Sequence, residues 1–306
     1  MWDSWIAMSL IAAGGWALSS VIDVCFVGDG IYSEPSDGPV IAGLFCALPV
    51  FTTAGAGGLG NADWGVAFVA MLSGVGYLLH IYFYFKALFV LNDASNAEIF
   101  NTLSILFVPV FAFVLLDERM AVVDYLAIAL AIGGILVLVS FQVSRLSGLV
   151  IGYLTVSVFF VSLTMVLQAW VLRHIGYASA VWLFSLAAFM TIVVALALQP
   201  RRRRRIGRLC RRFGAVFVVV QLLELGAVFG SQRATDVGPS VSLVALLECS
   251  LPLFVMAFSW LFMVLSRCLD QSSSVAVHSA LALQTSAAPS KLASMLLILV
   301  AMFLVQ

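Results

Sequence analysis

The chain has 306 residues, of which 63% are hydrophobic and only 10% are charged, with a mean hydropathy of +1.13. This composition excludes an ordinary soluble globular protein, and the formal net charge of zero gives no reason to expect a nucleic-acid partner. Several apolar runs reach the roughly 20 residues that a helix needs to cross a hydrocarbon core, without the strict alternation of a barrel strand. We therefore expect a multi-pass integral membrane protein built from helices.

The apolar runs predict ten transmembrane helices. In chain order, we place them at residues 5–27, 39–56, 65–90, 95–116, 121–141, 148–171, 178–199, 213–232, 238–265 and 290–305. A serine-rich connection at residues 266–289 precedes the last helix, and we expect it to include an amphipathic segment on the membrane surface.

The two halves of the sequence share a pattern. Laying residues 84–119 over residues 227–262 places Asp93 on Asp236 and Pro109 on Pro252, with apolar residues on apolar residues between them. An odd number of helices in each half makes the halves antiparallel in the membrane. The expected fold is an all-α membrane protein with ten transmembrane helices as two inverted five-helix repeats, residues 1–145 and residues 146–306.

One segment carries most of the positive charge. Five arginines follow one another in the predicted loop, and Arg208, Arg211 and Arg212 come soon after them. Positive loops beside membrane spans stay in the cytoplasm, so we expect the Arg201–Arg212 loop to be cytoplasmic and both termini to lie outside. The run is interpreted as a topology anchor, and recognition of anionic lipid headgroups is the alternative. The anchor residues are Arg201, Arg202, Arg203, Arg204 and Arg205.

Ionisable residues inside spans are costly in lipid and are treated as functional candidates. Lys86 and Glu98 lie equally far from the turn at residue 92, so the hairpin places them at similar depth and predicts that they can pair. A role in substrate binding and a structural ion pair near the interface, with Lys86 extending toward water, both remain open.

A second pair of candidates lies deeper. Glu224 and Glu248 are equally far from Asp236, near the middle of the membrane. Two carboxylates close together in a low dielectric cannot both ionise easily, so one of them can take and release a proton. The alternative is a protonated carboxyl group that hydrogen bonds to a neighbouring helix and never meets a substrate.

Helical spacing adds further cavity candidates. His80 and Tyr84 share a stripe, Asn101 shares a face with Glu98, and Gln221 shares a face with Glu224. Trp16 lies in the first helix, and for His80 a hydrogen-bonded core histidine is the competing interpretation. Enzyme motifs such as HExxH, GxSxG and a phosphate loop are missing, and the histidines and cysteines are dispersed. We therefore expect no enzyme, no metal site and no cofactor.

A family resemblance rests on local segments. YFKAL at Tyr84–Leu88, the turn after it, the proline within the next span and LLDER at Leu115–Arg119 together resemble the EamA-like family of the drug/metabolite transporter superfamily. The second half echoes them with GPSVSLVALLECSLPLF at Gly238–Phe254. The resemblance implies ten helices in two inverted repeats, a central cavity and alternating access. It also implies export or exchange of amino acids, metabolites or drugs, driven by a proton gradient or by exchange.

Our leading hypothesis is a secondary transporter of a small solute in the plasma or inner membrane, with protonation of Glu224 or Glu248 as a candidate coupling step. One alternative is a protein of the same fold that moves a lipid or a lipid-linked headgroup. The other is a membrane subunit that stabilises a complex and transports nothing.

Overall fold

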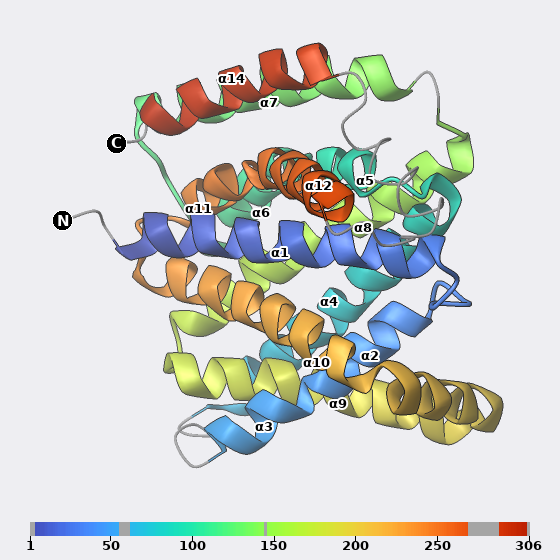
Figure 1. Cartoon of the computed structure of the whole chain (residues 1–306). Coiled ribbons are helices and arrows are strands. Elements are labelled where there is room, and N and C mark those ends of the chain that lie inside the picture. Colours follow the sequence, from blue (N-terminus) through green and yellow to red (C-terminus); the bar gives the residue numbers. More distant parts are fainter. Residues whose placement is uncertain (1–3, 55–61, 144–145, 269–287, 305–306) are drawn as a thin grey trace.

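The computed structural model describes residues 4–54, 62–143, 146–268 and 288–304, and all regular structure within them is helical (Figure 1). The helices of the first half are α1 (Ser4–Gly28), α2 (Asp37–Phe45), α3 (Ala47–Thr53), α4 (Trp64–Leu91), α5 (Ala94–Asn101), α6 (Ser104–Leu116) and α7 (Val122–Val143). Those of the second half are α8 (Gly148–Leu172), α9 (Tyr177–Leu198), α10 (Pro200–Val237), α11 (Val241–Glu248), α12 (Leu251–Cys268) and α14 (Ala288–Leu304).

The expectation of an all-helical, multi-pass membrane protein is confirmed. Seven segments of the described chain are long and apolar enough to cross a membrane. They are Trp5–Gly28, Trp64–Leu91, Ala94–Leu116, Gly148–Leu172, Tyr177–Leu198, Pro200–Val237 and Val241–Val264. The apolar helices at Asp37–Thr53 and Val122–Val137 are shorter, so the count of ten spans stays a prediction. The expected amphipathic segment lies mostly outside the described residues.

Two of the apolar runs are each divided into a helix pair. The break between α5 and α6 falls at Thr102 and Leu103, and the break between α11 and α12 falls just before Pro252. Pro109 is inside α6, where its missing N–H removes one helical hydrogen bond. Both short helices begin at a side-chain cap, because Asp93 accepts from the Asn96 amide at 3.2 Å and Ser240 accepts from the Leu243 amide at 3.0 Å.

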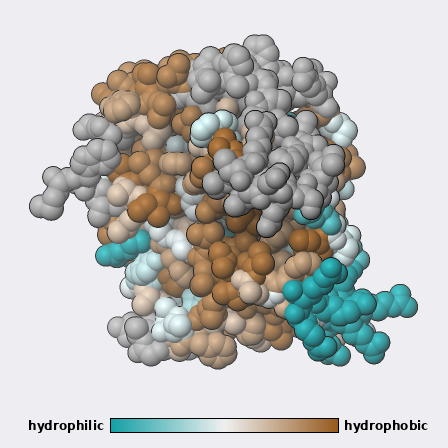
Figure 2. Space-filling view, in the orientation of Figure 1, coloured by the Kyte–Doolittle hydropathy of each residue, from teal (hydrophilic) through white to brown (hydrophobic). Residues whose placement is uncertain are grey.

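The arginine run is helical, and the predicted loop at residues 201–212 is wrong. Helix α10 begins at Pro200 and continues without interruption to Val237, over 38 residues. Proline is favourable at the first position of a helix, and arginine is a good helix former, so the run continues the apolar helix that follows it. Figure 2 shows a hydrophilic patch at the end of the molecule where α10 begins.

Helices from the two halves pack against one another. Helix α1 contacts α10 and α12, while α4 contacts α8 and α9, and α6 also contacts α8. Helices α7 and α14 pack together along one side of the bundle (Figure 1). Gly74 of α4 allows a close approach to α9, since a Cβ atom there would overlap the backbone oxygen of Phe184.

An ionic cluster, the Arg205 cluster, ties the start of α10 to the start of α2. The guanidinium of Arg205 donates to Asp37 Oδ1 from Nε at 3.1 Å and from a terminal nitrogen at 2.8 Å, and it also pairs with Glu34. Asp37 is fully buried and accepts from the backbone amides of Ser33 and Glu34. The hydrogen bond from Arg205 holds the pKa of the Glu34 carboxyl below its usual range.

A second cluster, the Glu118 cluster, ties the loop after α6 to the start of α11. Buried Glu118 accepts from Ser242 Oγ at 2.6 Å and from the amides of Val241 and Ser242 at 3.2 and 3.3 Å, which satisfies donors at a helix N-terminus. The guanidinium of Arg173 lies 3.6 Å from Glu118. Arg173 precedes α9 and Arg205 follows it, so the two clusters lie at opposite ends of the bundle, roughly 33 Å of helix apart.

Candidate functional site

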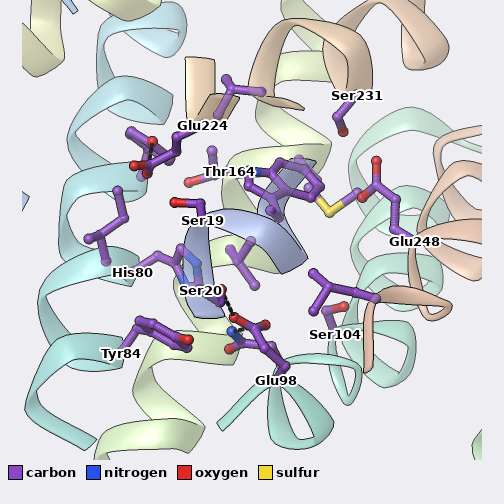
Figure 3. Close-up of a pocket in the computed structure, with 18 of the residues that line it drawn as sticks. Ser19, Ser20, His80, Tyr84, Glu98, Ser104, Thr164, Glu224, Ser231 and Glu248 are labelled. Carbon is purple, nitrogen blue, oxygen red and sulfur yellow. Dashed lines mark hydrogen bonds between the residues drawn. The ribbon is translucent and has the colours of Figure 1, made fainter. Parts of the chain in front are cut away.

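A cavity of about 160 Å³ lies among α1, α4, α5, α8, α10 and α11 (Figure 3). Most of the exposed surface of its wall is apolar, although most of the lining residues carry a polar group. The polar lining residues are Ser19, Ser20, Asp23, Tyr77, His80, Tyr84, Glu98, Asn101, Thr102, Ser104, Thr164, Gln168, Glu224, Ser231, Gln232, Thr235 and Glu248. A concave, largely apolar site with a few convergent polar groups is the usual form of a small-molecule site.

Glu98 is fixed by helices from two parts of the first half. Ser20 Oγ of α1 donates to Glu98 Oε1 at 2.6 Å, and Asn101 Nδ2 donates to Oε2 at 3.0 Å. Asn101 lies one turn further along the same short helix, as the sequence spacing predicted. The carboxyl group is buried, so these bonds replace the water that it would otherwise bind.

Glu224 of α10 is held by one residue of the first half and by one residue of its own helix. Tyr77 Oη of α4 donates to Glu224 Oε1 at 2.6 Å, and Gln221 Nε2 donates to Oε2 at 3.1 Å. Gln221 is therefore behind the carboxyl group and is not one of the lining residues, whereas Tyr77 and Glu224 both reach the cavity.

Glu248 ends α11 on another side of the cavity, away from Glu224 (Figure 3). Glu224 is bonded to Tyr77 and Gln221, so the expected contact between the two glutamates is not formed. The reason is the position of the turn. The sequence pattern centred the hairpin on Asp236, but α10 continues to Val237 and α11 starts only at Val241, so the two glutamates are not equally far from the turn.

Lys86 does not pair with Glu98 and does not line the cavity. Its Nζ lies 4.7 Å from the ring centroid of Tyr82 and 5.1 Å from that of Tyr153 on α8. Cation–π contacts of this length stabilise an ammonium that lacks a carboxylate partner. The hairpin does bring both residues near the same turn, but the helical rotation directs Lys86 toward α8, while Glu98 faces Ser20 of α1.

The remaining candidates line the cavity as expected. Trp16, His80, Tyr84 and Asn101 all contribute to its wall. The Nδ1 atom of His80 lies 2.9 Å from Ser157 Oγ, so this ring is also hydrogen bonded within the core.

Sequence reasoning missed several lining residues. Asp23 of α1 is buried, and Tyr32 Oη donates to it at 3.4 Å. The rule that selected the glutamates would also have selected Asp23, because it too is an acid inside a long apolar run. Gln168, Ser231 and Gln232 have no such signal, since uncharged polar residues also serve helix packing.

Four carboxyl-bearing residues thus line one cavity, and no lysine or arginine of the described chain lines it. In the described part of the chain, no group of three or more His, Cys, Asp or Glu side chains is placed to hold a metal ion. The arrangement can hold a small solute and can bind or release protons at carboxyl groups away from bulk water.

Comparison with known proteins gives a fold and no function. No family model matches the chain, and no curated protein matches it. It is similar to a protein of known crystal structure at 18% sequence identity and a TM-score of 0.57, covering 98% of this chain and 99% of that one. Nearly the whole chain therefore shares its architecture with a solved structure.

Proposed function

We propose that this chain is a secondary transporter of the EamA-like kind, which moves a small solute across the plasma or inner membrane by alternating access. The observation that carries the proposal is the cavity itself. Its carboxyl groups come from α1, α5, α10 and α11, so helices of both halves build one site. Ionisable groups buried among membrane-spanning helices typically mark a substrate or ion pathway.

An inverted repeat of ten spans is supported by the pattern of contacts between the halves. Helix α1 packs on α10 as α4 packs on α8, and α1 packs on α12 as α6 packs on α8. Two hydrogen bonds join residues 147 positions apart, from Tyr77 to Glu224 and from Cys249 to the Thr102 carbonyl. Contacts between equivalent positions are expected near a pseudo-two-fold axis, where transporters of this class bind their substrates.

The same offset relates the caps of the short helices, Asp93 and Ser240. The offset that relates the two halves is therefore four residues longer than the offset in the sequence pattern, which had placed Asp93 on Asp236. A repeat defined by helix caps and breaks does not need matching side chains.

The positions of the two ionic clusters support alternating access. A transporter exposes its site to one side at a time, so contacts at each end must form and break in turn. The Arg205 cluster lies at the end where α10 begins and the Glu118 cluster at the opposite end, so each is placed to hold one end shut in one state of the cycle. By the positive-inside rule we assign the Arg205 end to the cytoplasm.

Recognition of anionic lipid headgroups remains a second candidate for the arginine run. Arg201, Arg203 and Arg204 are exposed at the start of α10, while Arg205 is engaged with Asp37. Exposed arginines at a membrane surface attract anionic headgroups. Neutralising the exposed arginines distinguishes the two roles, because a headgroup collector then loses lipid binding, whereas a topology anchor changes only orientation.

The test is transport by purified protein in liposomes under an imposed pH gradient. Amino acids, nucleobases and amines are first screened for stabilisation of the purified protein, and the ligands found are then followed as radiolabelled solutes. We expect saturable uptake whose pH dependence is altered by Glu224→Gln or Glu248→Gln. A folded protein that moves none of these solutes contradicts transport and favours the role of a complex subunit.

A further inference from the structure

The cavity wall carries four carboxyl groups, those of Asp23, Glu98, Glu224 and Glu248. Both oxygens of Glu98 and both of Glu224 accept hydrogen bonds from neighbouring side chains, whereas Glu248 Oε1 has no partner among the described residues. Most other polar atoms of the wall are hydroxyl or amide groups, which carry no charge. The wall therefore presents several acidic groups to whatever occupies the cavity.

No basic side chain of the described residues balances these acids from within the wall. Lys86 points to the rings of Tyr82 and Tyr153, and His80 is bonded to Ser157. Arg205 is bound in its own cluster at the end of the bundle. A buried carboxyl group is either neutral with a proton bound or paired with a cation, and for the ionised form the described wall supplies no cation of its own. A cationic solute would supply that partner.

Unsatisfied atoms point to the same conclusion independently. Glu248 is only 9% exposed and lines the cavity, yet its Oε1 atom has no hydrogen-bond partner in the described structure. The side-chain oxygens of Asn101 and Gln232, which also line the cavity, are likewise without a donor. Buried acceptors without a donor are rare in proteins, and N–H groups of a ligand would satisfy these three. The donor Gln168 Nε2 and the hydroxyl of Tyr84 also line the cavity without a partner in the described part of the chain, so the ligand can carry an acceptor as well.

The rest of the wall describes the body of that ligand. Trp16, Tyr77, Tyr84 and Phe184 place aromatic rings beside the acids. Aromatic faces attract cations and also cover apolar surface. The wall therefore suits a compact apolar group that carries a positive charge.

We propose that the cavity binds an organic cation, an ammonium or amidinium group on a compact apolar body, and that Glu248 is its principal carboxylate partner. This inference rests on the proposed function, because it takes the cavity to be the solute site. Beyond the proposed function, it states that the solute is positively charged and carries N–H donors.

A matched series of probes tests the charge. Benzamidine, benzamide and benzoate have nearly the same shape and are cationic, neutral and anionic at neutral pH. We expect benzamidine to bind the purified protein at least tenfold more tightly than benzamide, and benzoate to be the weakest of the three, in calorimetric titrations. Equal or tighter binding of benzamide or benzoate would overturn the inference.

A matched pair of variants tests the partner. Glu248→Gln keeps the shape of the side chain but removes its charge, and we expect it to weaken benzamidine binding about tenfold or more. Asp117→Asn removes an exposed carboxylate outside the cavity and should change nothing. Glu98→Gln is the second cavity variant if Glu248→Gln does not fold, and it should also weaken binding. Unchanged benzamidine affinity in a folded cavity variant contradicts the assignment.

Flux measurements separate this inference from the proposed function. If benzamidine binds with the expected preference but never crosses proteoliposome membranes, transport fails and the cation site stands. If benzamide or benzoate is transported and benzamidine is neither bound nor moved, the cation site fails and transport stands.

Discussion

Replacing Arg205 with alanine should destabilise the protein far more than replacing its neighbours in the arginine run. The substitution leaves the carboxylate of Asp37 fully buried without its charged partner. Breaking a buried ion pair from one side costs about 3–5 kcal/mol. The Asp37 carboxylate keeps the amide donors of Ser33 and Glu34, and the Arg205 side chain is 20% exposed, so we expect a loss of roughly 2–3 kcal/mol in the free energy of unfolding.

The contact with Glu34 adds little to that figure, because its side chain is 49% exposed and well screened. Arg204→Ala is the matched control, since Arg204 is exposed on the same helical turn, and its effect should stay within about 0.5 kcal/mol. The assay is unfolding of the detergent-solubilised protein by titration with a denaturing detergent, followed by circular dichroism. If Arg205→Ala and Arg204→Ala unfold alike, the Arg205 cluster does not hold the helix ends together.

Two further predictions concern the same framework. The hydrogen bond from Arg205 lowers the pKa of Glu34 in the folded protein. This hydrogen bond therefore stabilises the fold fully at a pH above the unfolded-state pKa of Glu34, and the stabilisation is lost as the pH falls through the lower folded-state pKa. The difference in unfolding free energy between wild type and Glu34→Gln should therefore shrink on acidification, and a constant difference would contradict this contact. Gly74→Ala should lower the unfolding temperature by several degrees, because the new methyl group meets the Phe184 carbonyl, whereas Gly152→Ala, with open space around it, should not.

Much of the architecture could be predicted from the sequence. The apolar runs were long enough to locate the helices, since composition and length alone decide which segments can cross a membrane. The buried acids Glu98, Glu224 and Glu248 were selected by the same physics, and all three line the cavity. Their selection needed only the cost of burying charge in an apolar run.

Partners and registers could not be predicted in the same way. Lys86 and Glu98 are near each other along the hairpin, but the rotation of each helix decides which neighbour a side chain meets. The role of Glu118 as the cap of α11 depends on a contact with Ser242, 124 positions away. In the sequence, Glu118 was noted only within the LLDER segment at Leu115–Arg119.

The helical arginine run was missed for a different reason. A row of charges was taken as the end of a span, yet arginine has a high helix propensity and Pro200 is a favourable first residue. Nothing between Pro200 and the apolar part of α10 interrupts the helix. The row of charges therefore did not mark the end of the helix.

Alternating access around the cavity can be tested without a known substrate. Cys249 lines the cavity and is 2% exposed, so a charged thiol reagent reaches it only through an opening to one side. The protein is prepared with Cys249 as its sole cysteine, and Ser104→Cys in a cysteine-free background gives a second position in the wall.

A membrane-impermeant methanethiosulfonate is applied to right-side-out and to inside-out vesicles, and the modified fraction is followed by mass spectrometry. We expect both positions to react from either side of the membrane, because each end of the cavity opens in turn. Reaction from one side only, or from neither side, in a folded protein would contradict it.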